Sequence, residues 1–182
     1  MEFIQTTHPQ ILRIVPDVYP DERGYFMVPF EKSVFQAAGL DINIVQSNQS
    51  SSKLGTLRGL HYQITHPQGK LLRVVRGKIF DVGVDLRRSS PWFGRWAGAI
   101  LSEENKEMFW VPPGFAHGFL ALSERADVVY QTTDIYAPES ERCIRWDDPE
   151  LAIEWPLTPE MQILISDKDR HGLLFSEAET YP

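Results

Sequence analysis

The chain has 182 residues, 42% of them hydrophobic and 24% charged, and no low-complexity segment. This composition excludes a disordered protein and predicts a single domain over residues 1–182 with one sizeable core. The formal charge of −7 disfavours a broad surface for nucleic acid or for an anionic membrane, so the cations for any phosphorylated ligand must be gathered locally.

Most of the predicted elements are short strands separated by turn signals, a pattern typical of an all-β sandwich or barrel. Within 69–87, alternating residues predict two strands joined by a hairpin turn at Arg76-Gly77-Lys78. The other strands are expected at 11–15, 26–30, 42–48, 56–63, 94–101, 107–111, 118–122, 127–135 and 142–146.

The sequence predicts one clear helix, EKSVFQAAG (31–39), which contains no proline and ends at Gly39. From about residue 147 the chain is punctuated by prolines and mixed in character. We expect this part to form a tail of loops and short helical turns that lies over the β body.

The single cysteine, Cys143, excludes an intramolecular disulfide and a zinc cluster built from cysteines. We expect it to be a buried thiol in a reducing compartment. MEFIQTTHPQ, at the start of the chain, shows no signal peptide, and the longest weakly polar run, WVPPGFAHGFLAL, is too short to span a bilayer. These features predict a cytoplasmic protein.

Two histidines lie in otherwise apolar strands. His61, in LRGLHYQ, could be a hydrogen-bonded core residue, a general base or a metal ligand. His117 follows Pro-x-Gly-x-x in VPPGFAHGF, which resembles the second motif of the cupins, jelly-roll barrels whose histidine often ligates a metal. The first cupin metal motif usually has a second histidine, which is missing after His61. Because a catalytic divalent site usually has three protein ligands, we expect no metal here.

Other polar residues surround His61 on or near the predicted strands. Strict alternation places Arg58 and His61 on opposite faces, whereas a β-bulge at Gly59 would turn both inward. Taken singly, Lys70 could be a solvated rim residue and Tyr130 a half-buried strand aromatic. Together, a base, a cation and a phenol favour proton transfer next to a carbonyl.

Seven segments of the sequence, taken together, resemble one known family. They are PDERGYF (20–26), VQSNQSSSK (45–53), LRGLHYQ (57–63), QGKLLRVVRGKIFDVGVDLR (68–87), SPWFGRW (90–96), VPPGFAHGFLALSE (111–124) and ISDKD (165–169). In this order they resemble the dTDP-4-dehydrorhamnose 3,5-epimerase family over nearly the whole chain. The resemblance implies a cupin-type jelly roll, no cofactor, a dTDP-sugar substrate, and a homodimer with exchanged N-terminal strands.

The resemblance also implies roles for individual residues. His61 would remove the protons at C3 and C5, which the C4 ketone acidifies, and Asp169 would orient this base. Lys70 would stabilise the enolate and Tyr130 would return the proton from the opposite face. The implied substrate-binding residues are Arg23, Gln46, Ser47, Asn48, Arg58, Lys70, His117, Tyr136, Glu141 and Lys168, with Tyr136 stacked on the thymine.

The sequence departs from the family at one position, where Val28 replaces a glutamate that contacts the nucleotide in many members. Three other functions stay open at this point. They are a single-position epimerase of a related dTDP-4-keto-deoxysugar, a metal-dependent cupin oxygenase, and a non-catalytic carbohydrate-binding jelly roll.

Overall fold

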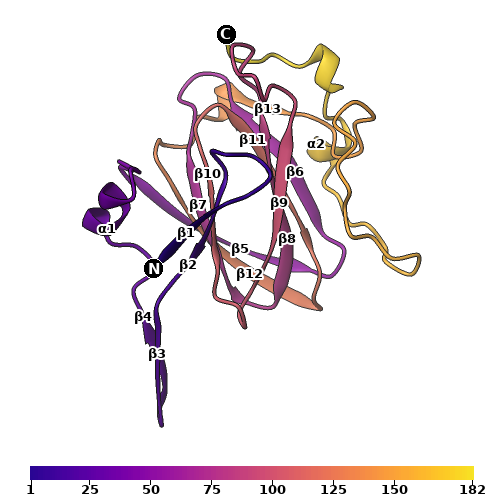
Figure 1. The fold of residues 1–182 in the computed structure, drawn as a ribbon. Helices are drawn as coiled ribbons and strands as arrows, with labels where there is room; N and C mark the ends of the chain where they lie inside the picture. Colours follow the sequence, from indigo (N-terminus) through magenta and orange to yellow (C-terminus); the bar gives the residue numbers. More distant parts are fainter.

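Two facing antiparallel sheets form the body of the protein, which we describe from a computed structural model covering residues 1–182 (Figure 1). The six-stranded sheet has the order β1 (Glu2–Gln5), β2 (Leu12–Val15), β10 (Met108–Val111), β7 (Lys70–Arg76), β12 (Arg125–Thr132) and β5 (Gln46–Lys53). The five-stranded sheet has the order β13 (Glu141–Cys143), β6 (Leu57–Gln63), β11 (Phe115–Ala121), β8 (Lys78–Asp85) and β9 (Trp96–Ser102). This architecture confirms the predicted all-β jelly roll.

The remaining elements lie around this body. A hairpin, β3 (Val18–Asp21) and β4 (Gly24–Met27), extends away from the two sheets at the bottom of Figure 1. The predicted helix forms as α1 (Lys32–Ala37), shorter than expected, and Gly39 follows its C-cap residue Ala38 with a positive φ of 84°, the backbone conformation that glycine favours. The tail contains α2 (Asp167–Arg170) and the short 3-10 helix Phe175–Glu177, and another 3-10 turn, Pro138–Ser140, precedes β13.

Three apolar clusters hold these layers together. The first lies between the two sheets and includes Leu72, Phe109 and Phe119. The second lies between the outer face of the five-stranded sheet and the tail, where Trp155 and Phe175 pack. The third lies under α1 and β1 on the outer face of the other sheet. Alternate strand residues point into the space between the two sheets, and the first cluster fills one end of that space.

Ten of the eleven strands in the two sheets were predicted, but several of their ends were wrong. The segment expected at 42–48 forms a strand only from Gln46 and continues to Lys53. QSNQSSSK is poor in the residues typical of strands, yet it pairs with β12 along its whole length, so tertiary pairing outweighs local propensity. The strands β1 and β3 were not predicted. None of the helices is long and apolar enough to cross a membrane.

Candidate active site

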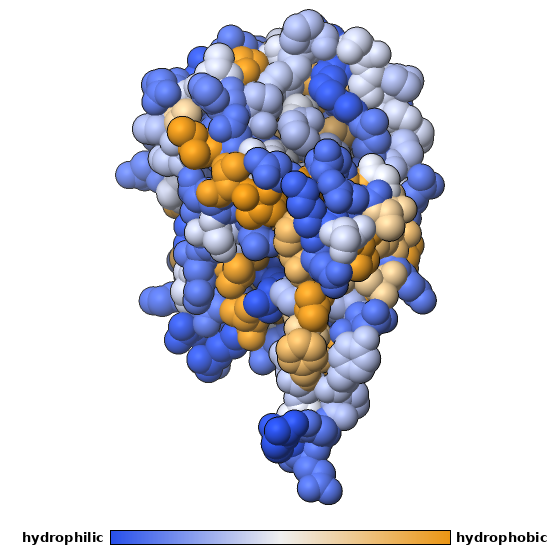
Figure 2. Space-filling model, turned by 90° about the vertical axis from the view of Figure 1, so that its left-hand side faces the viewer, coloured by the Kyte–Doolittle hydropathy of each residue, from blue (hydrophilic) through white to orange (hydrophobic).

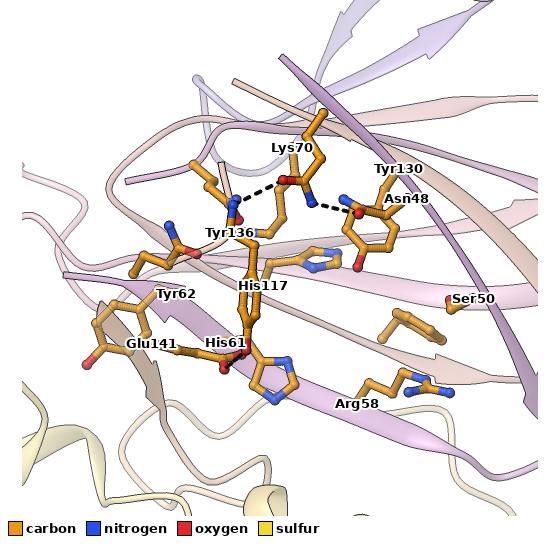
Figure 3. Close-up of a pocket in the computed structure, with 14 residues that line it drawn as sticks. Asn48, Ser50, Arg58, His61, Tyr62, Lys70, His117, Tyr130, Tyr136 and Glu141 are labelled. Carbon is orange, nitrogen blue, oxygen red and sulfur yellow. Dashed lines mark hydrogen bonds between the residues drawn. The ribbon is translucent and has the colours of Figure 1, made fainter. Parts of the chain in front are cut away.

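The open end of the barrel holds a cavity of about 370 Å³ between the two sheets (Figure 3). Its lining residues are Gln46, Asn48, Ser50, Arg58, His61, Tyr62, Gln63, Gln68, Lys70, His117, Phe119, Tyr130, Tyr136 and Glu141. The fold therefore brings together most of the predicted catalytic and binding residues, although they come from six different strands and one loop.

The two sheets contribute different chemical groups to this cavity. The five-stranded sheet contributes the two histidines, since His61 on β6 lies opposite His117 on β11. Lys70 on β7 and Tyr130 on β12 come from the six-stranded sheet. The imidazole of His61 and the phenol of Tyr130 therefore face the cavity from opposite sides, as the close-up shows (Figure 3).

A β-bulge in β6 explains how two residues three apart both face the cavity. The register shifts between the pair His61–His117 and the pair Arg58–Phe119, so β6 has one extra residue there. Gly59 lies at this point with a φ of 120°, and a Cβ on it would be 2.6 Å from the Cα of Gly118. The predicted bulge at Gly59 is thus confirmed.

His61 is hydrogen-bonded through Nε2 to the carboxylate of Asp169, although the two residues are 108 positions apart in the sequence. Asp169 lies on α2 behind the strand and is nearly fully buried. Burial acts to raise its pKa, but hydrogen bonds from His61, Ser166 and the backbone of Gly59 outweigh burial, and the pKa is lowered. Because the carboxylate is an acceptor, Nε2 carries the hydrogen, which leaves a lone pair on Nδ1.

Lys70 is buried in the wall of the cavity, with 8% of its surface exposed. Burial lowers its pKa to about 8, against the attraction of Glu141 and Asp81, which raises it. The prediction left open a solvated rim residue at this position, and the structure excludes it. A partly desolvated ammonium of this kind interacts strongly with a negative charge that develops beside it.

His117 is held by a carboxylate that sequence reasoning did not single out as part of the site. Its Nε2 donates to both oxygens of Asp81, at 2.9 and 3.1 Å. Asp81 is completely buried, and burial raises its pKa against the opposing effect of His117. Alternation along 79–85 places Asp81 on the face opposite to Phe80, and this was the available signal.

Polar residues at the mouth of the cavity form a connected network, drawn with dashed lines in Figure 3. Gln46 donates to Asn48 (2.8 Å) and accepts from the backbone N–H of Tyr136 (3.1 Å). The Tyr136 hydroxyl donates to Glu141 (2.8 Å), which also pairs with Lys168. Half of the Tyr136 surface is exposed, so its ring is free to meet a ligand at the mouth.

Three predicted binding residues do not line the cavity of this chain. Ser47 is exposed on the other face of β5, because successive strand residues alternate. Arg23 lies at the turn of the β3–β4 hairpin, where its side chain pairs with Asp21. Lys168 does not line the cavity and reaches it only through Glu141. The roles of these three residues stay predictions.

Several lining residues were not predicted as binding residues: Ser50, Tyr62, Gln63, Gln68 and Phe119. The two glutamines support the loop that carries Tyr136. Gln63 accepts from the backbone N–H of Ala137 and donates to the carbonyl of Ile135, while Gln68 donates to the carbonyl of Asp134. Period-two alternation from His61 places Gln63 inward, in agreement with its position in the cavity wall.

One group of side chains beside the cavity has the composition of a metal site. The ligand atoms of His61, Cys143 and Asp169 all lie within 4.8 Å of one another. Burial, with a further contribution from Asp169, raises the pKa of Cys143 to about 12, so the thiol is neutral. The cupin motifs suggested His61 and His117 as a metal-binding pair. The group described here contains His61 but not His117.

Comparisons with known proteins identify the family. The family described as dTDP-4-dehydrorhamnose 3,5-epimerase matches residues 5–177. Proteins of that name from Pseudomonas aeruginosa and Methanothermobacter thermautotrophicus are 51% and 50% identical, covering 96% and 98% of this chain and 96% and 97% of their own. The structure of dTDP-6-deoxy-D-glucose-3,5-epimerase from Legionella pneumophila, in complex with dTDP-4-keto-L-rhamnose, superposes with a TM-score of 0.94 at 47% identity over 98% of this chain and 94% of that one. This chain therefore belongs to the dTDP-4-dehydrorhamnose 3,5-epimerase family and is an epimerase.

Proposed function

We propose that this chain inverts C3 and C5 of dTDP-4-dehydro-6-deoxy-D-glucose, giving dTDP-4-dehydro-L-rhamnose for dTDP-L-rhamnose biosynthesis. The observation that carries this proposal is the placement of His61 and Tyr130 on facing sheets with Lys70 at the same cavity. We also propose a cytoplasmic location, where the lone thiol of Cys143 would stay reduced.

His61 acts as the base. Its Nδ1 accepts the proton of C3 or C5, both of which lie next to the C4 ketone, and the electron pair moves onto the C4 oxygen. Asp169 supports this step because it fixes the ring orientation and stabilises the imidazolium that forms. The ammonium of Lys70 meets the enolate oxygen, a position in which one donor typically accelerates the reaction about 10²–10³-fold.

Tyr130 returns the proton from the other side. Inversion requires that the new C–H bond form on the face opposite to the bond that was broken, so the base itself cannot complete it. Burial raises the pKa of Tyr130, although Arg58 acts to lower it, so the phenol stays protonated at neutral pH. The geometry of the two sheets supports this assignment.

Arg58 is suited to the diphosphate of the substrate. Its Nε donates to Ser52 (3.1 Å) and its Nη2 to the carbonyl of Ser51 (3.3 Å), which fixes the guanidinium on the wall of the cavity. A planar fork held in this way can donate its remaining hydrogens to phosphate oxygens. Tyr136 at the mouth would then stack on the thymine.

The projecting hairpin supports a homodimer with exchanged N-terminal strands. A two-stranded hairpin is marginally stable alone in water, yet Tyr19, Tyr25 and Phe26 on this one are 57–64% exposed. Apolar residues also gather on the molecular face above the base of the hairpin (Figure 2). We propose that the hairpin lies on a second copy and places Arg23 at the cavity of that copy.

Mixed dimers test this arrangement. Arg23→Ala and His61→Ala proteins, each impaired alone, are unfolded and refolded together. If Arg23 serves the partner's cavity, the mixed dimer contains one fully intact site and activity returns. If Arg23 serves its own chain, or if the protein is a monomer, every site lacks one residue and no activity returns.

The function itself is tested by proton NMR in heavy water with dTDP-4-dehydro-6-deoxy-D-glucose as substrate. The double epimerase should incorporate one deuteron at C3 and one at C5 and give the inverted sugar, trapped by a following 4-keto reductase. Deuterium at only one carbon would mean a single-position epimerase. Absence of exchange would contradict both the double and the single-position epimerase and would favour a non-catalytic sugar-binding protein.

A further inference from the structure

The strand register brings the only cysteine next to the catalytic base. Cys143 on β13 lies directly opposite His61 on β6, and directly opposite residues on neighbouring antiparallel strands project to the same face. The Sγ atom of Cys143 is 3.9 Å from Oδ1 of Asp169, which is hydrogen-bonded to His61. A thiol, an imidazole and a carboxylate therefore meet at one point beside the cavity.

These three groups are the donor types that zinc prefers. A zinc ion binds Cys, His and carboxylate at roughly 2.0–2.3 Å, so its tetrahedral ligand atoms lie about 3.3–3.8 Å apart. The three atoms here already lie within 4.8 Å of one another, so shifts of about 1 Å complete the geometry. The side chain of His61 is 28% exposed, so a zinc ion can reach this group from the solvent.

We propose that His61, Cys143 and Asp169 form a site at which added Zn²⁺ binds and inhibits the enzyme. On binding, Cys143 gives its thiol proton to solvent and binds as the thiolate, and Asp169 binds through one oxygen. His61 binds through Nε2, and its hydrogen moves to Nδ1. An imidazole with Nε2 on zinc and hydrogen on Nδ1 has no lone pair for the substrate proton.

Zinc binding and inhibition by zinc can be tested separately. Zinc binding depends only on the three side chains, whereas inhibition also depends on the proposed role of His61 as the base. Cys143 itself takes no part in the proposed epimerisation. A protein with serine in its place should therefore keep its activity and lose the site.

Direct binding is measured first with cobalt, which reports a bound thiolate by a sulfur-to-metal charge-transfer absorption. The chelator-treated protein is titrated with Co²⁺ and then with Zn²⁺, which should displace the cobalt and remove the band. Cys143→Ser and Cys143→Ala should both show no band. A band of equal strength in both variants, or no band in the original protein, would overturn the proposal whatever the enzyme's activity.

Inhibition is measured with the same proteins in the epimerisation assay. Zn²⁺ should inhibit the original protein and EDTA should restore it, whereas Cys143→Ser should need roughly 100-fold more zinc for the same inhibition. His66→Ala is the matched control, because His66 and Asp134 form a surface pair 3.3 Å apart that could bind zinc nonspecifically. Equal zinc sensitivity of the original protein and Cys143→Ser would contradict the proposed inhibition, and so would its loss in His66→Ala.

Discussion

Lys70, the residue proposed to stabilise the enolate, destabilises the fold while it is charged. Its pKa is lowered from 10.5 to about 8 because the charged form is buried. Since the unfolded chain binds this proton more tightly, Lys70 contributes least to stability below about pH 8 and most above pH 10.5. The full difference corresponds to about 3 kcal/mol.

Lys70→Met should therefore stabilise the protein while impairing it. At pH 7 we expect the free energy of unfolding to rise by about 1–3 kcal/mol, and turnover to fall about 10²–10³-fold. Urea unfolding at pH 7 and at pH 10 checks the sign, because the advantage of the variant should shrink as the pH rises. A less stable variant at pH 7, or unchanged turnover, would show that Lys70 has another role.

The same titration predicts how activity depends on pH. Lys70 stabilises the enolate only while it is charged, so the activity of the original protein should decline as the pH passes through about 8. The residual activity of Lys70→Met should lack this decline. Values of kcat/KM measured from pH 6 to pH 10 report the pKa values of the free enzyme and distinguish the two profiles, and identical profiles would count against the assignment.

For single residues, the sequence predicted the groups proposed for the reaction better than the other residues that surround them. His61, Lys70 and Tyr130 were predicted because their segments resemble a known family and because their side-chain types suit proton transfer, and all three line the cavity. Asp81 and Ser50 were missed, since alternation gives only the strand face on which a residue lies and does not say what that face lines. Their placement depends on which strands become neighbours.

At the scale of single elements, β6 is the strand that organises the site. Its bulge turns Arg58 and His61 inward, and the backbone of Gly59 also contacts the carboxylate of Asp169. The close approach of Gly118 leaves no room for a side chain at Gly59, whose Cβ would also be 2.7 Å from the carbonyl of His117.

Gly59→Ala should therefore be strongly destabilising. We expect a loss of about 2–4 kcal/mol from the steric conflict and the positive φ together. Gly39→Ala is the matched control, because Gly39 also has a positive φ but no atom lies within 4 Å of its missing Cβ. It should lose only about 1–2 kcal/mol. Thermal and urea unfolding compare the two, and an equal loss would mean that the bulge tolerates a side chain.

Glycine within a strand pattern was enough to predict this bulge, whereas strand ends were harder to predict. The polar run of β5 looks like a loop, and β1 and β3 are too short to show a period. Their strand conformation comes from the partners that β12, β2 and β4 provide. Such partners are distant in sequence or weakly patterned, so local residues could not specify them.

For the whole molecule, the facing sheets are the feature that connects fold to function. One sheet supplies His61, the proposed base, and the other supplies Tyr130 and Lys70, with apolar residues filling the closed end. The sequence predicted an all-β barrel from its many short strands. It could not by itself place Asp169 behind His61, because that contact depends on how the tail folds back over the β body.

Tyr130→Phe tests the central claim, that proton removal and proton return occur from opposite sheets. The substitution keeps the ring and removes only the acid, so His61 can still take a proton and return a deuteron to the same face. Proton NMR in heavy water should show continued exchange at C3 or C5, with a much larger fall in the yield of inverted sugar. Near-normal inversion, or an equal loss of exchange and inversion, would contradict the account.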